Sequence, residues 1–281
     1  MATLTPEQVI LGYNNAVQQV RTAVNLYATR TWAGAGSWRD QDVDRLVNLI
    51  LPKVQAGQVQ VAQLTSAYVA SLAKYVDGRT VKASTVSRSM ILDARKATPT
   101  EVYRRPAVQM YTALSNGATL TEAVGQGLTR LSSLLLTDMQ LAKTHQERVS
   151  YGAAGYEYTI RTLTGRENCA LCEVATTQRY HVKNLRPIHP GCDCGSRQVE
   201  ASFDPGQVID AKRLSQIHSA VEEQFGQSDR GARYIDGLKT VQYADGVRGA
   251  DYTDLIVVRE HGEIGPVLTW RDQHFTGPND L

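Results

Sequence analysis

The residues of this chain with the clearest chemistry are its cysteines, which all lie between positions 169 and 194. Cys169 and Cys172 form a CxxC pair, and Cys192 and Cys194 form a CxC pair further along. A CxxC pair can present two thiolates to one tetrahedral ion, and four soft ligands complete the usual coordination of Zn²⁺. The spacing therefore predicts a structural zinc site made by these four cysteines.

The fourth ligand has an alternative in His189, which stands three positions before Cys192. An imidazole can replace a thiolate at zinc. Pro190 follows His189 directly and indicates a turn that directs the imidazole outward. We therefore favour Cys194 over His189, while the other three cysteines belong to the site in either version.

Three other roles for the cysteines fit the sequence less well. A redox CxxC begins a helix after a buried strand; residues 156–163 alternate like a strand, but no convincing helix follows them. Disulfides need an oxidising compartment, and the N-terminus lacks the basic and apolar regions of a signal peptide. Cysteines that only pack in a core would be scattered along the chain. A zinc-closed loop in a reducing cytoplasm explains the clustering best.

Motifs for catalysis are few. A catalytic zinc needs an open coordination position and a general base, and neither HExxH nor the His-x-Glu pattern of zinc deaminases occurs. An HNH-type nuclease would place a histidine-rich hairpin between CxxC pairs, but residues 181–190 lack a convincing Asp–His pair. Ser71 and Lys74 match SxxK inside an expected helix. The sequence favours a closed structural zinc and keeps a zinc nuclease as an alternative.

The composition is that of an ordinary soluble protein, with 281 residues, 42% hydrophobic and 21% charged side chains. The formal net charge is +2 without a run of like charges, so bulk electrostatics do not predict nucleic-acid binding. No apolar run approaches the roughly 18 residues that cross a bilayer. We therefore expect no membrane segment.

The first 150 residues have the apolar periodicity of helices, separated by capping and turn signals. Capping boxes begin at Thr5, Thr98 and Thr119. A helix that starts near Asp40 contains Pro52 and Gly57, which can kink or split it. A shorter helix is expected over residues 84–96, and the helix after Thr119 is expected to reach about residue 152.

The pattern changes after this long helix. Residues 156–163 predict a strand that leads into the cysteine segment. The sequence Asp-Pro-Gly at 204–206 marks a boundary, and residues 208–225 then predict one amphipathic helix. Residues 255–260 and 266–270 flank a short turn and predict a β-hairpin.

The order of these features resembles the phage Mu protein F-like minor head proteins, the MuF domain family. The long helix ends in LAKTHQERVSYGAAGY, a strand leads to ENCALC, and PIHPGCDC closes the segment. Thr144 matches a threonine of the family's helix motif, whereas His145 stands where the family usually has Glu. The resemblance covers roughly residues 83–203. The residues on the family's pattern are Glu167, Cys169, Cys172, Pro187, His189, Pro190, Cys192 and Cys194, and Tyr180 stands between the two cysteine pairs.

The resemblance implies a minor capsid protein of a tailed phage, made in the host cytoplasm and held in the virion, inside the capsid near the portal vertex. It implies the portal protein as partner. The major capsid or scaffolding protein and packaged DNA are further candidates, and no membrane is involved. Relatives are often labelled capsid maturation protease, and that activity stays an alternative although the chain has no recognisable protease centre.

We predict a mainly α fold with a small α+β zinc-binding module, in three parts. A helical N-terminal region occupies residues 1–80, and a MuF-like domain with the cysteine cluster occupies residues 81–204. Residues 205–281 form a tail with an amphipathic helix and a β-hairpin. The function expected is that of a portal-bound minor head protein in head assembly, DNA packaging or ejection.

Overall fold

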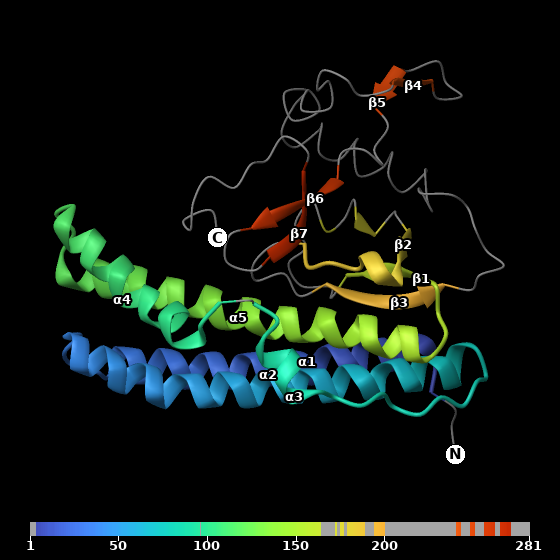
Figure 1. Ribbon diagram of the computed structural model, residues 1–281, viewed down its shortest axis with the longest axis horizontal. Helices are drawn as coiled ribbons and strands as arrows, with labels where there is room; N and C mark the ends of the chain where they lie inside the picture. Colours follow the sequence, from blue (N-terminus) through green and yellow to red (C-terminus); the bar gives the residue numbers. More distant parts are fainter. Residues whose placement is uncertain are drawn as a thin grey trace.

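The structure is a computed structural model that describes residues 4–95, 97–163, 172, 175–176, 179–188 and 194–199. It also describes the backbone of four strands at 240–242, 248–250, 256–261 and 265–270. Long helices run side by side and carry a small three-stranded sheet near one end (Figure 1). The predicted mainly α fold with a small β part is therefore confirmed for the described residues, while the zinc module stays a prediction.

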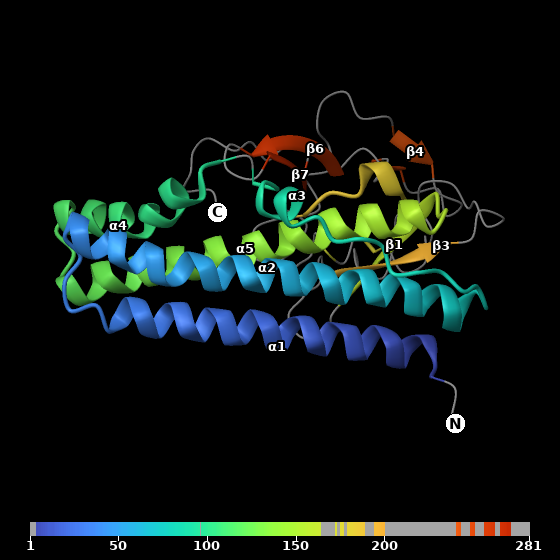
Figure 2. The same cartoon turned by 60° about the horizontal axis from the view of Figure 1, so that its bottom comes forward.

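The first two helices are α1 (Pro6–Ala33) and α2 (Asp40–Val76). The predicted capping box begins α1, because Thr5 Oγ1 accepts from the Gln8 amide at 3.3 Å and Gln8 Oε1 accepts from the Thr5 amide at 2.9 Å. Figure 2 shows α1 at the edge of the bundle, with α2 between it and the short α3 (Arg88–Leu92).

The helix α2 is continuous through Pro52 and Gly57, so the split that these residues suggested does not occur. Ile50 and Val54 are buried in the apolar core around Pro52, and this packing offsets the hydrogen bond that proline removes. Gly57 serves close packing: a Cβ there would lie 2.9 Å from Cε of Met139 on a neighbouring helix.

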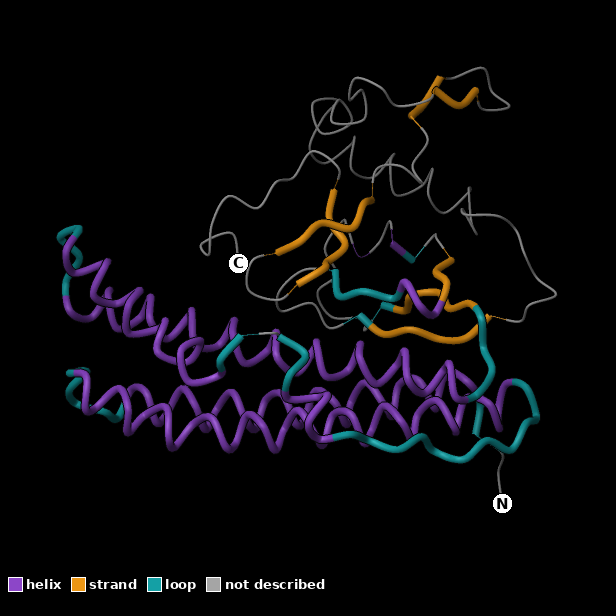
Figure 3. Tube along the Cα trace, in the orientation of Figure 1, coloured by secondary structure: helices purple, strands orange, loops and turns teal. Residues whose placement is uncertain are grey.

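The helix expected over residues 84–96 is much shorter in the structure, because α3 has only five residues. The chain before it is extended and runs back along the bundle (Figure 3). Ser66 Oγ donates to the carbonyl of Ser84 at 2.7 Å, and Gln146 Nε2 donates to the carbonyl of Thr85 at 3.4 Å. These carbonyls accept from side chains instead of from a helical backbone, which explains the missing turns.

The other long helices are α4 (Pro99–Ser115) and α5 (Leu120–Ala153). The capping box expected at Thr98 is wrong, since its side chain makes no capping bond, although the helix begins there with Pro99. The box at Thr119 is confirmed, with Glu122 as its partner. α4 covers the first half of α5, at the end of the bundle away from the sheet (Figure 1).

Two apolar clusters hold the helices together. The first joins residues of α1 and α2 to α4 and the first half of α5, and includes Trp32, Val54 and Leu135. The second joins α1 and α2 to the second half of α5, around Tyr68 and Met139. Both clusters contain residues from before and after position 80, where the sequence predicted a boundary between the N-terminal region and the next domain. The division of the chain into three parts remains a prediction. No helix among the described residues is long and apolar enough to cross a membrane.

The sheet has β1 (Tyr158–Thr162) at its centre, between β2 (Arg179–His181) and β3 (Gly195–Val199). Both pairings are antiparallel, and β1 confirms the strand expected before the cysteines. A 3₁₀ turn, η1 (Val182–Asn184), follows β2. The buried face of the sheet lies toward the helices and is polar: Thr159, Arg161, Tyr180, Ser196 and Gln198.

Two hairpins follow in the tail. β4 (Thr240–Gln242) pairs with β5 (Arg248–Ala250), and β6 (Ile256–His261) pairs with β7 (Gly265–Trp270), both antiparallel. The second pair confirms the hairpin predicted from residues 255–270. The amphipathic helix predicted over residues 208–225 lies outside the described residues.

Candidate functional site

Two of the predicted zinc ligands are described, and both are buried: Cys172 and Cys194 are 4% and 7% exposed. Cys169, Cys192 and the alternative ligand His189 lie outside the described residues. Within the part of the chain that is described, no three His, Cys, Asp or Glu side chains are grouped to hold a metal. The zinc site therefore remains a prediction, and the surroundings of Cys172 and Cys194 bear on it.

Both of these thiols act electrostatically on one tyrosine, Tyr180. Burial raises the pKa of Tyr180 to about 12, and the nearby guanidinium of Arg161 offsets part of this rise. Negative charge on Cys194 and on Cys172 raises the pKa further, so both sulfurs are within electrostatic reach of the Tyr180 hydroxyl. That hydroxyl donates to the carbonyl of Ala175 at 3.0 Å and ties the segment after Cys172 to β2.

A buried group of polar residues connects α5 to the sheet beside Cys194. We call it the polar junction, and its members are Lys143, Glu147, Tyr151, Arg161, Cys194 and Ser196. Lys143 Nζ donates to the carbonyl of Cys194 at 2.6 Å and lies 5.8 Å from the ring centre of Tyr13. The ammonium group is thereby fixed between a helix, a strand and an aromatic face.

Arg161 projects from β1 into the same junction. Its Nη1 donates to Sγ of Cys194 at 3.3 Å, and its Nη2 donates to the carbonyl of Arg186. Its guanidinium carbon lies 5.3 Å from the ring centre of Tyr180. One side chain therefore holds both flanks of residues 189–193, the segment that contains His189 and Cys192 in the sequence.

The carbonyl of Ser196 is held by two tyrosines from different helices. The hydroxyls of Tyr68 on α2 and Tyr151 on α5 both donate to it at 2.8 Å. The ring of Tyr68 stacks on Tyr13 with centroids 4.0 Å apart and planes 9° apart. Burial raises the pKa of all three tyrosines, so their hydroxyls stay neutral. They serve as fixed hydrogen-bonding groups and not as nucleophiles.

Glu147 is the acid of the junction and is 2% exposed. Burial raises its pKa, while the charges of Lys143 and Arg161 offset part of that rise. Within the described part of the chain its Oε1 has no hydrogen-bond partner. The junction thus places two cations and one carboxyl group, closed off from water, beside a cysteine. This arrangement suits a fixed structural centre better than a catalytic centre, which needs access for substrate.

Lys143, Glu147 and Arg161 were not predicted as site residues. Two signals pointed to them: Lys143 and Glu147 stand four residues apart on one helix, and Arg161 stands at an inward position of a strand. Charged side chains at buried positions are retained when they have specific partners. Helical periodicity assigns charged residues such as Lys143 and Glu147 to the solvent-facing side of a helix, so the pattern alone does not predict their burial.

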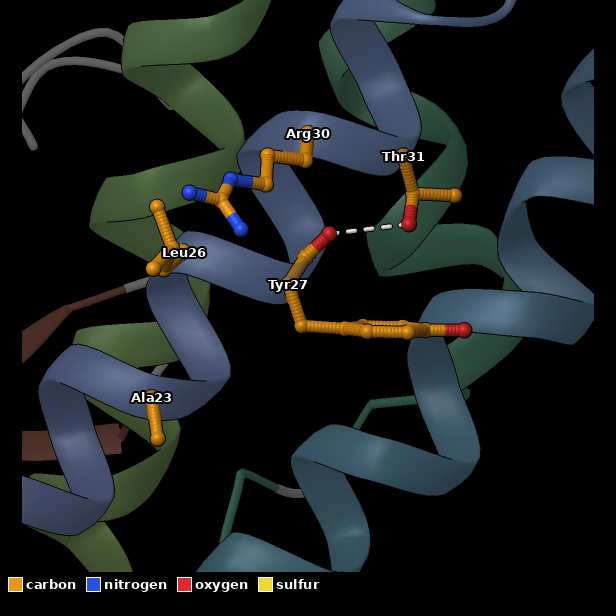
Figure 4. Close-up of a pocket in the computed structure, with 5 residues that line it drawn as sticks. All are labelled: Ala23, Leu26, Tyr27, Arg30 and Thr31. Atoms are coloured by element: carbon orange, nitrogen blue, oxygen red, sulfur yellow. Dashed lines mark hydrogen bonds between the residues drawn. The ribbon is translucent and has the colours of Figure 1, made fainter.

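A separate hollow of about 500 Å³ lies on α1 and is lined by Ala23, Leu26, Tyr27, Arg30 and Thr31 (Figure 4). Thr31 Oγ1 donates to the carbonyl of Tyr27 at 2.8 Å, which is a bond within the helix. Arg30 supplies the charge of the lining, and all five side chains come from one helix. The hollow therefore lacks the converging polar groups of a ligand site.

Comparison of the chain with family models, with curated proteins and with solved structures finds no match. The interpretation of the polar junction accordingly depends on its own geometry and on the motif in the sequence. The geometry places the buried Cys194 beside two cations, Lys143 of α5 and Arg161 of β1.

Proposed function

We propose that the chain is a minor head protein of a tailed phage, bound to the portal inside the capsid, with a structural zinc site. The observation that carries the proposal is the contact between Lys143 and Cys194, at 2.6 Å across 51 positions of sequence. Lys143 lies in the helix segment of the MuF-like motif, and Cys194 ends its closing segment. The separate pieces of the motif therefore belong to one physical unit, as expected if the motif encodes one module.

The proposed zinc ligands are Cys169, Cys172, Cys192 and Cys194. Zinc supplies metal–sulfur bonds that cross-link the two cysteine pairs, and a segment with few apolar residues needs such a link to keep one shape. Cys194 is favoured over His189 as the fourth ligand because its sulfur is buried and faces a guanidinium donor. Thiolates that bind zinc are commonly oriented by hydrogen bonds of this kind.

The test is to co-express the full chain with the portal protein of the same phage, and to measure both retention on tagged portal protein and metal content. We expect a stable complex and about one zinc per chain. Cys172→Ser should release the zinc and weaken portal binding. Ser89→Ala on the short α3, with an exposed side chain far from the cysteines in sequence, serves as the matched control and should change neither.

Three results would contradict the proposal. A wild-type chain that does not bind the portal removes the docking function. Cleavage of capsid or scaffolding protein that one Ser, Cys or His substitution abolishes would establish the protease alternative. Nicking of DNA with added Mg²⁺ or Mn²⁺ that a His181 or His189 substitution stops would establish the nuclease alternative.

A further inference from the structure

We propose that Arg161 is a positioning residue for the metal centre: its guanidinium presents the sulfur of Cys194 to zinc and ties together the two flanks of the segment that carries the second cysteine pair. The inference rests on the proposed zinc site. It adds a role for a residue of β1 that lies outside both cysteine pairs.

The position of Arg161 is unusual for a charged side chain. It stands in the central strand of the sheet, at 5% exposure, directly opposite Ser196 in the register with β3. Removing a guanidinium from water is costly unless its donors find acceptors in fixed positions. The acceptors here are the sulfur of Cys194 and the carbonyl of Arg186. The desolvation is thus offset by contacts that converge on the closing segment.

The two acceptors explain why the side chain is arginine. The guanidinium is a planar fork with donors on separate nitrogens, and here one nitrogen serves the sulfur while another serves the carbonyl. An ammonium group is a compact point charge on a flexible stem, and it cannot span both acceptors in the same way. Lysine at this position would keep the charge and lose the connection between the two flanks.

Lys143 completes the support for Cys194. It holds the backbone carbonyl of Cys194 from α5, while Arg161 holds the side chain from β1. The cysteine is therefore held at its main chain and at its sulfur by two different elements. Such preorganisation lowers the entropy that metal binding must remove, and loss of an outer contact typically costs about 10–100-fold in metal affinity.

The experiment measures zinc affinity of the full chain by competition with a chromophoric chelator, and the absorption spectrum of the Co²⁺-substituted protein. The variants are Arg161→Gln and Arg161→Lys. The matched control is Arg79→Gln, because Arg79 also donates to a backbone carbonyl, that of Ala154 at 2.8 Å, and lies over a tyrosine ring at 5.1 Å. Near-UV circular dichroism of each apoprotein reports whether the bundle is folded.

We expect Arg161→Gln to lower zinc affinity about 10–100-fold and to shift the thiolate-to-cobalt charge-transfer band, because one thiolate loses its donor. Arg161→Lys should recover part of the affinity but not the spectrum. Arg79→Gln should leave both unchanged. A purely structural role of Arg161 would leave the thiolate-to-cobalt charge-transfer band of its variants unchanged.

The outcomes separate the inference from the proposed function. A wild-type chain that binds neither Zn²⁺ nor Co²⁺ removes the metal site itself. A wild-type chain that binds zinc while Arg161→Gln binds it equally well, with an unchanged cobalt spectrum, overturns the inference alone. If Arg161→Gln does not fold, Arg161→Lys decides: wild-type affinity and spectrum in that variant overturn the inference, and a changed spectrum supports it.

Discussion

The two halves of α5 are buried by different means. Residues 120–136 contribute apolar side chains to the first cluster, with Leu131, Leu134 and Leu135 at its centre. Residues 137–151 bury a series of polar side chains within the same helix. These are Thr137, Asp138, Gln140, Lys143, Thr144, Gln146, Glu147 and Ser150.

The contrast follows from what each half packs against. The first half faces other helices, whose backbone groups are already paired, so non-directional apolar packing suffices. The second half packs on α1 and α2 and in addition faces an extended segment and a small sheet, where carbonyls such as those of Thr85 and Cys194 need donors. Side chains of α5 supply these donors. Polar burial therefore marks the half of the helix that positions irregular chain.

The largest effect is expected from Asp138→Ala, which removes the acceptor of a buried ion pair. Asp138 accepts from Nε of Arg95 and from the hydroxyl of Tyr103, each at 2.7 Å. The substitution leaves a guanidinium buried without this carboxylate, which costs about 3–5 kcal/mol. Urea denaturation followed by circular dichroism measures the loss. A cost below about 1 kcal/mol, as at an exposed pair, would show that the polar half contributes little to stability.

A smaller cost, about 3 kcal/mol, is expected in the apolar half from Leu131→Ala, because the residue is 1% exposed and its removal leaves a cavity. The two halves of α5 should differ in how well they tolerate substitution by a residue of similar shape. Leu131→Met should cost less than about 1.5 kcal/mol, whereas Asp138→Asn should cost most of what Asp138→Ala costs. Val108→Ala, at a position 61% exposed on α4, is the control and should be nearly neutral. Equal tolerance at positions 131 and 138 would remove the distinction between the halves.

The sequence predicted the apolar half well and the polar half poorly. Helical periodicity, the caps at Thr5 and Thr119 and the strand before the cysteines are local properties, and local reasoning identified them. Residues 84–96 were expected to be helical because their own propensities allow it. Side chains of Ser66 and Gln146, remote in sequence, bind the carbonyls of Ser84 and Thr85 instead, and the helix forms only over residues 88–92.

The candidate site shows the same division. The cysteines were identified by type and spacing, which need no tertiary information. Lys143 is an ordinary surface residue by pattern, and only contacts between segments distant in sequence bring it and Arg161 to Cys194. The partners of a buried charge depend on contacts between distant segments, and a single sequence does not reveal them.

A pH-dependent difference is expected from Glu147→Gln. Because burial raises the pKa of Glu147 in the folded state above the ordinary 4.5, the folded chain holds this proton more tightly than the unfolded chain. The contribution of the protonated carboxyl to the free energy of unfolding is fully present below pH 4.5. It is lost as pH rises through the folded-state pKa. The wild type should therefore lose stability relative to Glu147→Gln as pH rises through this window. Urea midpoints from pH 4 to 8 give the difference.

A control of opposite sign is available at the start of the same helix. Hydrogen bonds from Thr119 lower the pKa of the exposed Glu122, so its contribution is present above pH 4.5 and is lost on acidification. The difference between wild type and Glu122→Gln should thus change with pH in the direction opposite to that of Glu147→Gln. Stability differences that run parallel for the two variants would contradict the assignment of Glu147 as a buried carboxyl.

The smallest effects are expected at the tyrosines that share the carbonyl of Ser196. Tyr68→Phe or Tyr151→Phe alone should cost about 0.5–1.5 kcal/mol, since the other hydroxyl still donates to the carbonyl. The double variant removes both donors from a buried acceptor, so it should cost more than the sum, by about 0.5 kcal/mol or more. A double-mutant cycle of unfolding free energies measures this coupling. Tyr27→Phe, whose exposed hydroxyl lies 3.5 Å from the carbonyl of Leu49, should change little. Strict additivity at Tyr68 and Tyr151 would mean that the two helices act on β3 independently of each other.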